Sequence, residues 1–189
     1  LKFNKTDSGG IFLNSYNAKL TNEKNEEISH NFPVNRENTF TAKEAINLLE
    51  GRTVKIEFHN PKSDQQETAF VQFNFGEAKT EKGNYLFQNF YKNYGVETDK
   101  IVEKSNLIFD KPEYKENTIK SLEKGSIVKV KFNMNDQTID GKAILDPQNR
   151  NLKLYDSDMN RINTNKPLEG IEQDNKHEKS NVKEQSIKR

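Results

Sequence analysis

The sequence predicts an α+β fold with largely antiparallel sheets, two or three short helices and a disordered C-terminal tail. Three observations carry this prediction. Several segments alternate apolar and polar residues, two segments show helical spacing beside capping residues, and the end of the chain is almost wholly polar. The resulting order of strands, helix, strands, helices and strands is typical of the α+β class.

The first third of the chain reads as extended segments separated by turns. Apolar residues recur at short spacing after the turn at residues 7–10 and again before the polar stretch 21–27. We therefore expect a meander of about three strands at the start of the chain.

A helix is predicted over residues 41–50. Thr41 and Glu44 have the spacing of a capping box, in which each side chain satisfies a free backbone N–H of the other residue. An apolar stripe follows at helical spacing, made of Ala42, Ala45, Ile46 and Leu49. Gly51 is placed to end the helix in a left-handed conformation.

Two strands should follow, at residues 54–58 and 71–75, because apolar and polar side chains alternate in both. The polar link at 60–67 fits a hairpin loop. The next segment, residues 85–94, contains five aromatic side chains whose spacing fits neither a helix nor a strand cleanly, and we interpret it as a strand.

The second half repeats the order of the first. A short helix is expected at 97–104, and Asp110 with Glu113 forms a second possible capping box for a helix that Gly125 ends. Three further strands are predicted, at residues 127–132, 138–145 and 152–155.

These elements indicate one α+β domain over residues 1–165, and the repeated order leaves open a division into two similar halves near residue 95. Residues 166–189 are polar and charged, so we expect a disordered tail or linker there. The chain begins with Leu1 and not with Met, so we expect a segment of a longer polypeptide.

Composition excludes several classes of protein. The 30 basic and 29 acidic residues are spread evenly, which argues against a strongly basic nucleic-acid-binding domain. There is no cysteine, and therefore no disulfide, zinc–thiolate site or thiol catalysis. No apolar run is long enough for a membrane span or follows a secretion-signal pattern, so we expect no membrane association.

Two sets of polar residues are candidates for metal sites. Asp156, Asp158 and Asn160 open like a calcium loop, but Arg161 and Pro167 stand where that motif needs Gly and Glu, so a polar turn is the favoured interpretation. The three histidines, His30, His59 and His177, are far apart in sequence and are expected at the surface or at strand ends. No metal or other cofactor is therefore predicted.

Lysines and aromatic residues supply the candidate binding sites. Lys129 and Lys131 alternate with apolar residues and should form the solvent face of a strand; with Arg52 and Lys55 they are the candidates for nucleic-acid contact. The aromatic segment offers a second candidate surface for protein interaction, with packing in the core as the alternative; its members are Tyr85, Phe87, Tyr91 and Tyr94.

Several stretches together carry a family resemblance. They are Thr41-Ala-Lys-Glu-Ala-Ile-Asn-Leu-Leu-Glu-Gly-Arg52, Phe70-Val-Gln-Phe-Asn-Phe75, Asn93-Tyr-Gly95, Ser121-Leu-Glu-Lys-Gly125 and Leu154-Tyr-Asp-Ser-Asp-Met-Asn-Arg161. Over roughly residues 11–162 the chain resembles a domain family of unknown function from Bacteroidetes, found in long, sometimes repeated, proteins of mobile genetic elements. The resemblance implies an intracellular bacterial protein and suggests DNA maintenance or transfer. It implies no activity and no catalytic residues.

The function expected from these observations is that of a non-enzymatic interaction module of a larger mobile-element-associated bacterial protein. Its partner would be another protein or neighbouring domains of the same chain; nucleic acid is possible but not favoured. The alternative is a metal-dependent nucleic-acid-processing enzyme that uses carboxylates such as Asp140, Asp156 and Asp158, and a purely structural spacer is a third reading.

Overall fold

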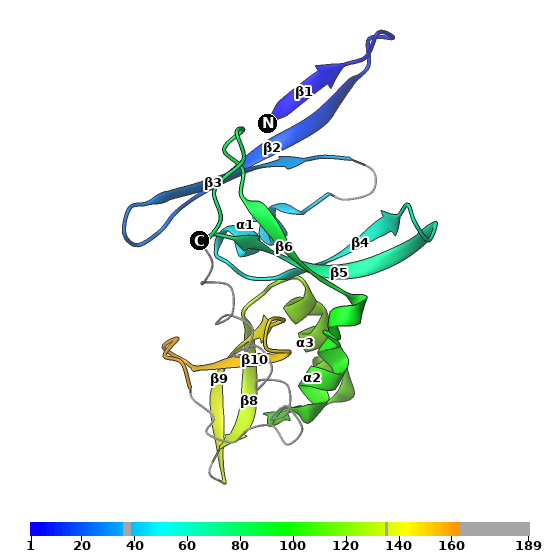
Figure 1. Ribbon diagram of the computed structural model, residues 1–189. Helices are drawn as coiled ribbons and strands as arrows, with labels where there is room; N and C mark the ends of the chain where they lie inside the picture. Colours follow the sequence, from blue (N-terminus) through cyan, green and yellow to red (C-terminus); the bar gives the residue numbers. More distant parts are fainter. Residues whose placement is uncertain (36–38, 135, 163–189) are drawn as a thin grey trace, which may run out of the picture.

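The computed structural model describes residues 1–35, 39–134 and 136–162. The predicted tail, residues 166–189, lies outside the described residues. Within them the chain forms ten strands in three antiparallel sheets, three α-helices and one short 3-10 helix, which confirms the α+β prediction. The β4–β5–β6 sheet lies between the other two (Figure 1).

The first sheet is the meander expected at the start of the chain. Its strands are β1 (Lys2–Lys5), β2 (Ile11–Thr21) and β3 (Glu27–Pro33), in that order. β1 and the adjoining part of β2 extend away from the rest of the molecule (Figure 1). Only the later part of this sheet packs on the body, where Phe32 is fully buried.

Helix α1 (Ala42–Leu49) has the predicted capping box. Thr41 Oγ1 accepts a hydrogen bond from Glu44 N at 3.3 Å, and Thr41 N donates to Glu44 Oε2 at 2.9 Å. Of the predicted stripe, Ala45 and Leu49 are buried against the first two sheets, together with Leu48. Ala42 and Ile46 are exposed, so the prediction was wrong for these two residues: the packed face is rotated toward Leu48. The helix ends at Gly51, whose φ of 77° is the left-handed conformation that glycine adopts without strain.

The second sheet has a core on both faces. Its strands are β4 (Val54–Asn60), β5 (Gln65–Asn74) and β6 (Leu86–Tyr91). Val71 and Phe73 of β5 face α1 and the first sheet, whereas Phe70 and Phe90 belong to the core of the second half of the chain. The aromatic segment is a strand only as far as residue 91, and a 3-10 helix, η1 (Lys92–Tyr94), follows.

The third sheet forms the second half of the molecule together with α2 (Thr98–Lys104) and α3 (Pro112–Glu123). Its strands are β7 (Leu107–Ile108), β8 (Val128–Met134), β9 (Gln137–Asp146) and β10 (Asn151–Asp156), in the spatial order β10–β9–β8–β7. The inner face of β8, with Val128, Val130 and Phe132, packs in one apolar cluster with Leu122 of α3 and Val102 of α2.

The predicted capping box of α3 is wrong. The residue at the cap position is Lys111, and no side chain caps this helix end. Pro112 explains the shift, because its fixed φ and missing N–H suit the first helical position and place the cap at the residue before it. Asp110 therefore precedes the cap residue, lies outside the helix and is exposed.

A helix followed by a three-stranded meander occurs twice. We call residues 42–91, with α1 and β4–β6, the first unit, and residues 112–156, with α3 and β8–β10, the second unit. Their sequences correspond: Leu-Leu-Glu-Gly at 48–51 stands against Leu-Glu-Lys-Gly at 122–125, with Leu48 and Leu122 at the same distance before the helix-ending glycine, and Val-Lys-Ile-Glu-Phe at 54–58 matches Val-Lys-Val-Lys-Phe at 128–132. In each unit we call one face of the meander the outer face. It is the face that bears Lys55 and Glu57 in the first unit, and Lys129 and Lys131 in the second.

Candidate binding site

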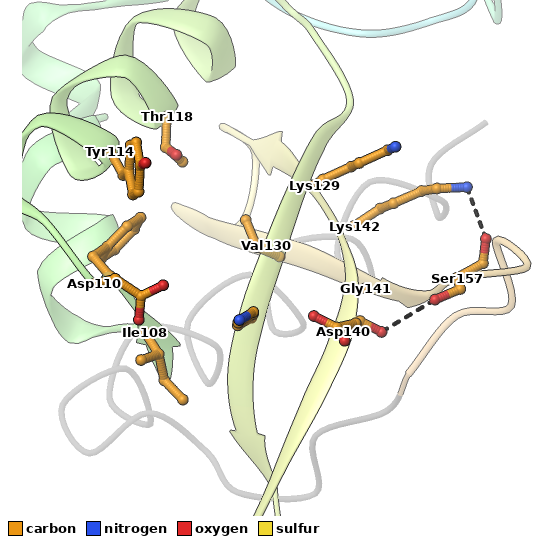
Figure 2. A pocket seen from close by; sticks show the side chains of 12 residues that line it. Ile108, Asp110, Tyr114, Thr118, Lys129, Val130, Asp140, Gly141, Lys142 and Ser157 are labelled. Carbon is orange, nitrogen blue, oxygen red and sulfur yellow. Dashed lines mark hydrogen bonds between the residues drawn. The ribbon is translucent and has the colours of Figure 1, made fainter.

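A groove of about 590 Å³ lies between α3 and the β8–β9 hairpin. It is within the range of volumes that small-molecule and short-peptide sites occupy. Figure 2 shows its wall: Tyr114 and Thr118 project from α3 on one side, and Lys129 and Lys142 lie side by side on the two strands. The groove is therefore built wholly from the second half of the chain.

Strand register brings the lysines of the groove together. Lys129 of β8 is directly opposite Lys142 of β9, and Lys131 is opposite Asp140. Residues directly opposite each other in an antiparallel pair share one face, as do residues two apart in a strand. Three lysines and one carboxylate of the β8–β9 hairpin consequently share the outer face of the second unit.

The positive charges of this face are only partly neutralised. Lys142 Nζ donates to the backbone oxygen of Ser157 at 2.8 Å, and Lys153 Nζ, on the same face of β10, is 3.2 Å from Asp146 Oδ2. Within residues 1–35, 39–134 and 136–162, neither Lys129 nor Lys131 has an ion pair, and both are exposed. A pair of free ammonium groups at this spacing favours an anionic ligand.

The groove also has an apolar wall and a second carboxylate. The apolar residues are Ile108 of β7, Phe109 directly after it and Tyr114 at the start of α3, and Tyr114 is half exposed. Asp110 lies between them in sequence. The groove can thus contact apolar, hydroxyl and acidic groups of one ligand. A nucleic-acid backbone, which presents only a line of phosphates, would not need such a varied lining.

Of the four basic residues singled out in the sequence, the structure brings only Lys129 and Lys131 together in the groove. Arg52 pairs with Glu50 and donates from Nε to the backbone oxygen of Gly125 at 2.6 Å. Lys55 Nζ is 2.9 Å from Glu123 Oε1. Arg52 and Lys55 therefore join the first unit to the second.

The aromatic candidates are divided between separate places. Tyr85 and Phe87 contact the ring of Phe73 in the core of the first unit, although Phe87 remains 37% exposed. Tyr91 packs edge-on against Phe58, on the same face of the sheet. Tyr94, in η1, donates from its hydroxyl to Gln148 O at 3.0 Å. Phe87 and Tyr91 share one face of the second sheet, whereas Tyr94 lies beyond the strand, in η1.

The carboxylates considered for a metal-dependent enzyme have different roles in the structure. Asp140 lines the groove, whereas Asp156 organises the turn after β10 by accepting bonds from the backbone N of Asp158 and of Asn160 at 2.9 and 2.8 Å. Hydrogen bonds from Asn160 hold the pKa of Asp156 below its usual value. The polar-turn interpretation is confirmed, and in the described part of the chain no group of three His, Cys, Asp or Glu side chains is placed to hold a metal ion.

His30 is not at the surface or at a strand end, contrary to expectation. It lies within β3, 5% exposed, with its ring 4.4 Å from the ring of Phe73, and its Nδ1 accepts a hydrogen bond from Tyr85 N at 3.2 Å. Burial, reinforced by the charge of Lys79, lowers its pKa to about 4. The neutral histidine serves as a polar anchor inside the first core.

Lys142 and Tyr114 are groove residues that the sequence reasoning missed. The predicted strands 127–132 and 138–145 flank a short turn, so pairing them as a hairpin would have placed Lys142 near Lys129. No local signal marks Tyr114, whose position depends on how α3 packs beside the sheet.

Comparison with known proteins gives no relative: no protein-family model, curated protein or solved structure matches this chain. Among the described helices, none has the length and apolar character needed to cross a membrane.

Proposed function

We propose that the protein is a non-enzymatic binding module that holds an acidic segment of a partner protein in the groove between α3 and the β8–β9 hairpin. The observation that carries this proposal is the pair of exposed lysines, Lys129 and Lys131, without ion pairs among the described residues, beside Lys142 and an apolar wall. Ammonium groups at the rim attract carboxylates, and the apolar wall adds contact area that desolvates them.

A protein segment fits the groove better than a nucleic acid. Asp110 and Asp140 line the same groove as the lysines and would repel a phosphate backbone that follows it. A peptide can instead place carboxylates against the lysines and amide or hydroxyl groups against the aspartates. The even distribution of charge along the chain supports the same choice.

The biological setting is also a proposal. The family resemblance supports a larger bacterial protein of a mobile genetic element, located in the cytoplasm, in which neighbouring domains of the same chain could supply the acidic segment. Gene neighbourhood and the full-length sequence are the observations that test this setting.

Fluorescence anisotropy tests the binding function. A labelled peptide of alternating Glu and Leu should bind, and its Gln-for-Glu counterpart should not; the affinity should fall with added salt, because exposed charges are screened. The double variant Lys129→Ala with Lys131→Ala should weaken binding by at least about tenfold. The matched control is Lys2→Ala with Lys5→Ala, which removes two exposed lysines from β1, a strand outside the groove, and should leave affinity unchanged.

Two results would overturn the proposal. Equal binding by the groove variant and the control variant would show that the lysines attract acidic peptides only through general charge. Submicromolar, salt-dependent binding of single- or double-stranded oligonucleotides, lost in the groove variant, would assign the groove to nucleic acid instead.

A further inference from the structure

The groove lies close to the point where the described part of the chain ends. Arg161 pairs with Tyr155 in an isolated β-bridge, and Tyr155 is directly opposite the groove residue Lys142 in the β9–β10 pair. Ile162 N donates to Leu154 O at 2.9 Å, which keeps the chain against β10 up to this residue. The chain therefore continues from the edge of the sheet whose other strands carry the groove lysines.

The distance from this edge to the lysines is short. One row across four neighbouring segments of the chain is made of Arg161, Tyr155, Lys142 and Lys129. Neighbouring strands are about 4.8 Å apart, so Lys129 is roughly 14 Å from Arg161 along this row. Five extended residues span at most about 17 Å, and residues 163–167 are therefore long enough to bring the next segment to the groove.

The segment that follows has the composition that the groove requires. Residues 168–174 read Leu-Glu-Gly-Ile-Glu-Gln-Asp, with three carboxylates, two apolar side chains and no basic residue. Basic residues outnumber acidic ones in the rest of the sequence, residues 175–189. The five basic residues there are Lys176, Lys179, Lys183, Lys188 and Arg189, and the two acidic residues are Glu178 and Glu184. After residue 162, net negative charge is thus confined to one stretch of seven residues.

The order of side chains in this segment also fits the two walls of the groove. Leu168 and Ile171 are each followed directly by a glutamate, and successive side chains of an extended chain point to opposite sides. The groove has lysines on its strand side and Tyr114 on its α3 side (Figure 2). A leucine can therefore face the apolar wall while the glutamate after it faces an ammonium group. Backbone N–H groups of the segment can donate to the two groove aspartates.

We propose that residues 168–174 occupy the groove of their own chain and compete there with the acidic segment of a partner. The inference rests on the proposed function of the groove and identifies an occupant within the same chain. Glu169 and Glu172 approach Lys129 and Lys131, which have no ion pair among the described residues. A short connection gives a tethered segment a local concentration in the millimolar range, so weak contacts suffice to fill the groove and a partner must displace the segment.

Peptide binding to the full chain tests this competition. The double variant Glu169→Gln with Glu172→Gln should bind the labelled Glu–Leu peptide at least about threefold more tightly than the unaltered protein, because a groove filled two-thirds of the time weakens a competing ligand threefold. The matched control is Glu178→Gln with Glu184→Gln. It removes the same amount of charge from the same end of the chain, leaves residues 168–174 unchanged, and should bind like the unaltered protein.

A second measurement reports on occupancy of the groove without any peptide. In ¹⁵N-labelled protein, Glu169→Gln with Glu172→Gln should shift the amide resonances around Lys129, Lys142 and Tyr114, which line the groove. The control variant should leave these resonances in place. The shifts should be the same at low and high protein concentration, because the contact is made within one chain.

The outcomes separate this inference from the proposed function. Peptide binding that depends on Lys129 and Lys131, but is equal in the two glutamine variants, would overturn the inference and leave the proposed function standing. Groove amides that shift only in the variant of Glu169 and Glu172, in a protein that binds no peptide, would support the inference while the partner-binding proposal fails. Shifts that appear only at high protein concentration would place the segment on a second copy and would overturn the inference.

Discussion

The first and second units share a helix, a left-handed glycine and a Val-Lys strand, yet they differ in what covers the outer face of the meander. In the first unit Lys55 is bound to Glu123 and Phe70 is buried in the second core. In the second unit Lys129 has the corresponding place and lines an open groove. The same local sequence pattern thus forms an internal joint in one unit and a candidate binding surface in the other.

The comparison shows that burial, and not residue type, separates the two roles. Both lysines are on alternating strands and both follow a glycine-ended helix. The difference is that Glu123, at the C-terminal end of α3, pairs with Lys55, whereas no carboxylate of the described residues pairs with Lys129. A strand lysine becomes available for a ligand when no neighbouring element of the described chain supplies its carboxylate.

The largest expected contrast is between the two helix-ending glycines. Gly51→Ala forces a left-handed conformation on alanine and should cost about 1–2 kcal/mol. Gly125→Ala adds a clash with Thr53 O and should cost about 2–5 kcal/mol. Urea unfolding measures both values, and equal costs would mean that the joint between the units relaxes freely around Gly125.

Leucine truncation in each helix should show that both units have a firmly packed core. Leu49 and Leu122 are 1% and 0% exposed, and replacing either by alanine should cost about 2–5 kcal/mol. Thr41→Ala removes only the cap of α1 and should cost about 1 kcal/mol. Thermal and urea unfolding test this order; a larger cost for Thr41 than for Leu49 would mean that α1 does not rely on its buried face.

Acid should weaken the packing of the first sheet on the second sheet before it weakens the second unit, because of His30. Its folded-state pKa of about 4 is below the unfolded value of 6.5, so its contribution is fully present above pH 6.5 and is lost as pH falls toward 4. The loss amounts to no more than about 3 kcal/mol. Hydrogen exchange should show amides of β3 and β5 losing protection before those of β8 and β9.

The matched variant for this experiment is His30→Asn, which retains a hydrogen-bond acceptor near Tyr85 N but does not titrate in this range. It should be less stable at neutral pH, and the fall in stability between pH 6.5 and 4 should be shallower than in the unaltered protein. An identical slope in the two proteins would assign the acid sensitivity to other groups.

The smallest expected effects compare the two equivalent lysines. Lys55→Ala breaks a partly exposed ion pair and should cost about 0.5–1 kcal/mol, which a double-mutant cycle with Glu123→Ala would assign to the pair. Lys129→Ala should change stability by less than about 0.5 kcal/mol, because no ion pair holds it within the described residues. A larger loss of stability for Lys129→Ala than for Lys55→Ala would contradict the assignment of Lys55 to the contact between the units and of Lys129 to a binding surface.

The sequence by itself determined the elements whose physics is local. The capping box fixed the start of α1, although the buried face of this helix includes Leu48 and not the predicted Ile46. Alternation located most strands of the second and third sheets to within about three residues, but β5 begins at Gln65, inside the predicted loop, and β7 was not predicted. Alternation also placed Lys129 and Lys131 on a solvent face. These features need only neighbours along the chain, because a helix turn or a pleat is defined by residues a few positions apart.

Only the tertiary structure decided how those elements are used. The two-residue β7 exists because it pairs with β8, and His30 is buried because the first and second sheets meet around it, where its ring contacts those of Phe32 and Phe73. In the sequence Arg52 and Lys55 are candidates equal to Lys129, but in the structure Arg52 donates to Gly125 O and Lys55 pairs with Glu123 of α3, whereas Lys129 has no such partner among the described residues. Burial and charge pairing depend on residues about 70 positions away, as in the 73-residue separation of Arg52 and Gly125, and no local pattern in one sequence records such distances.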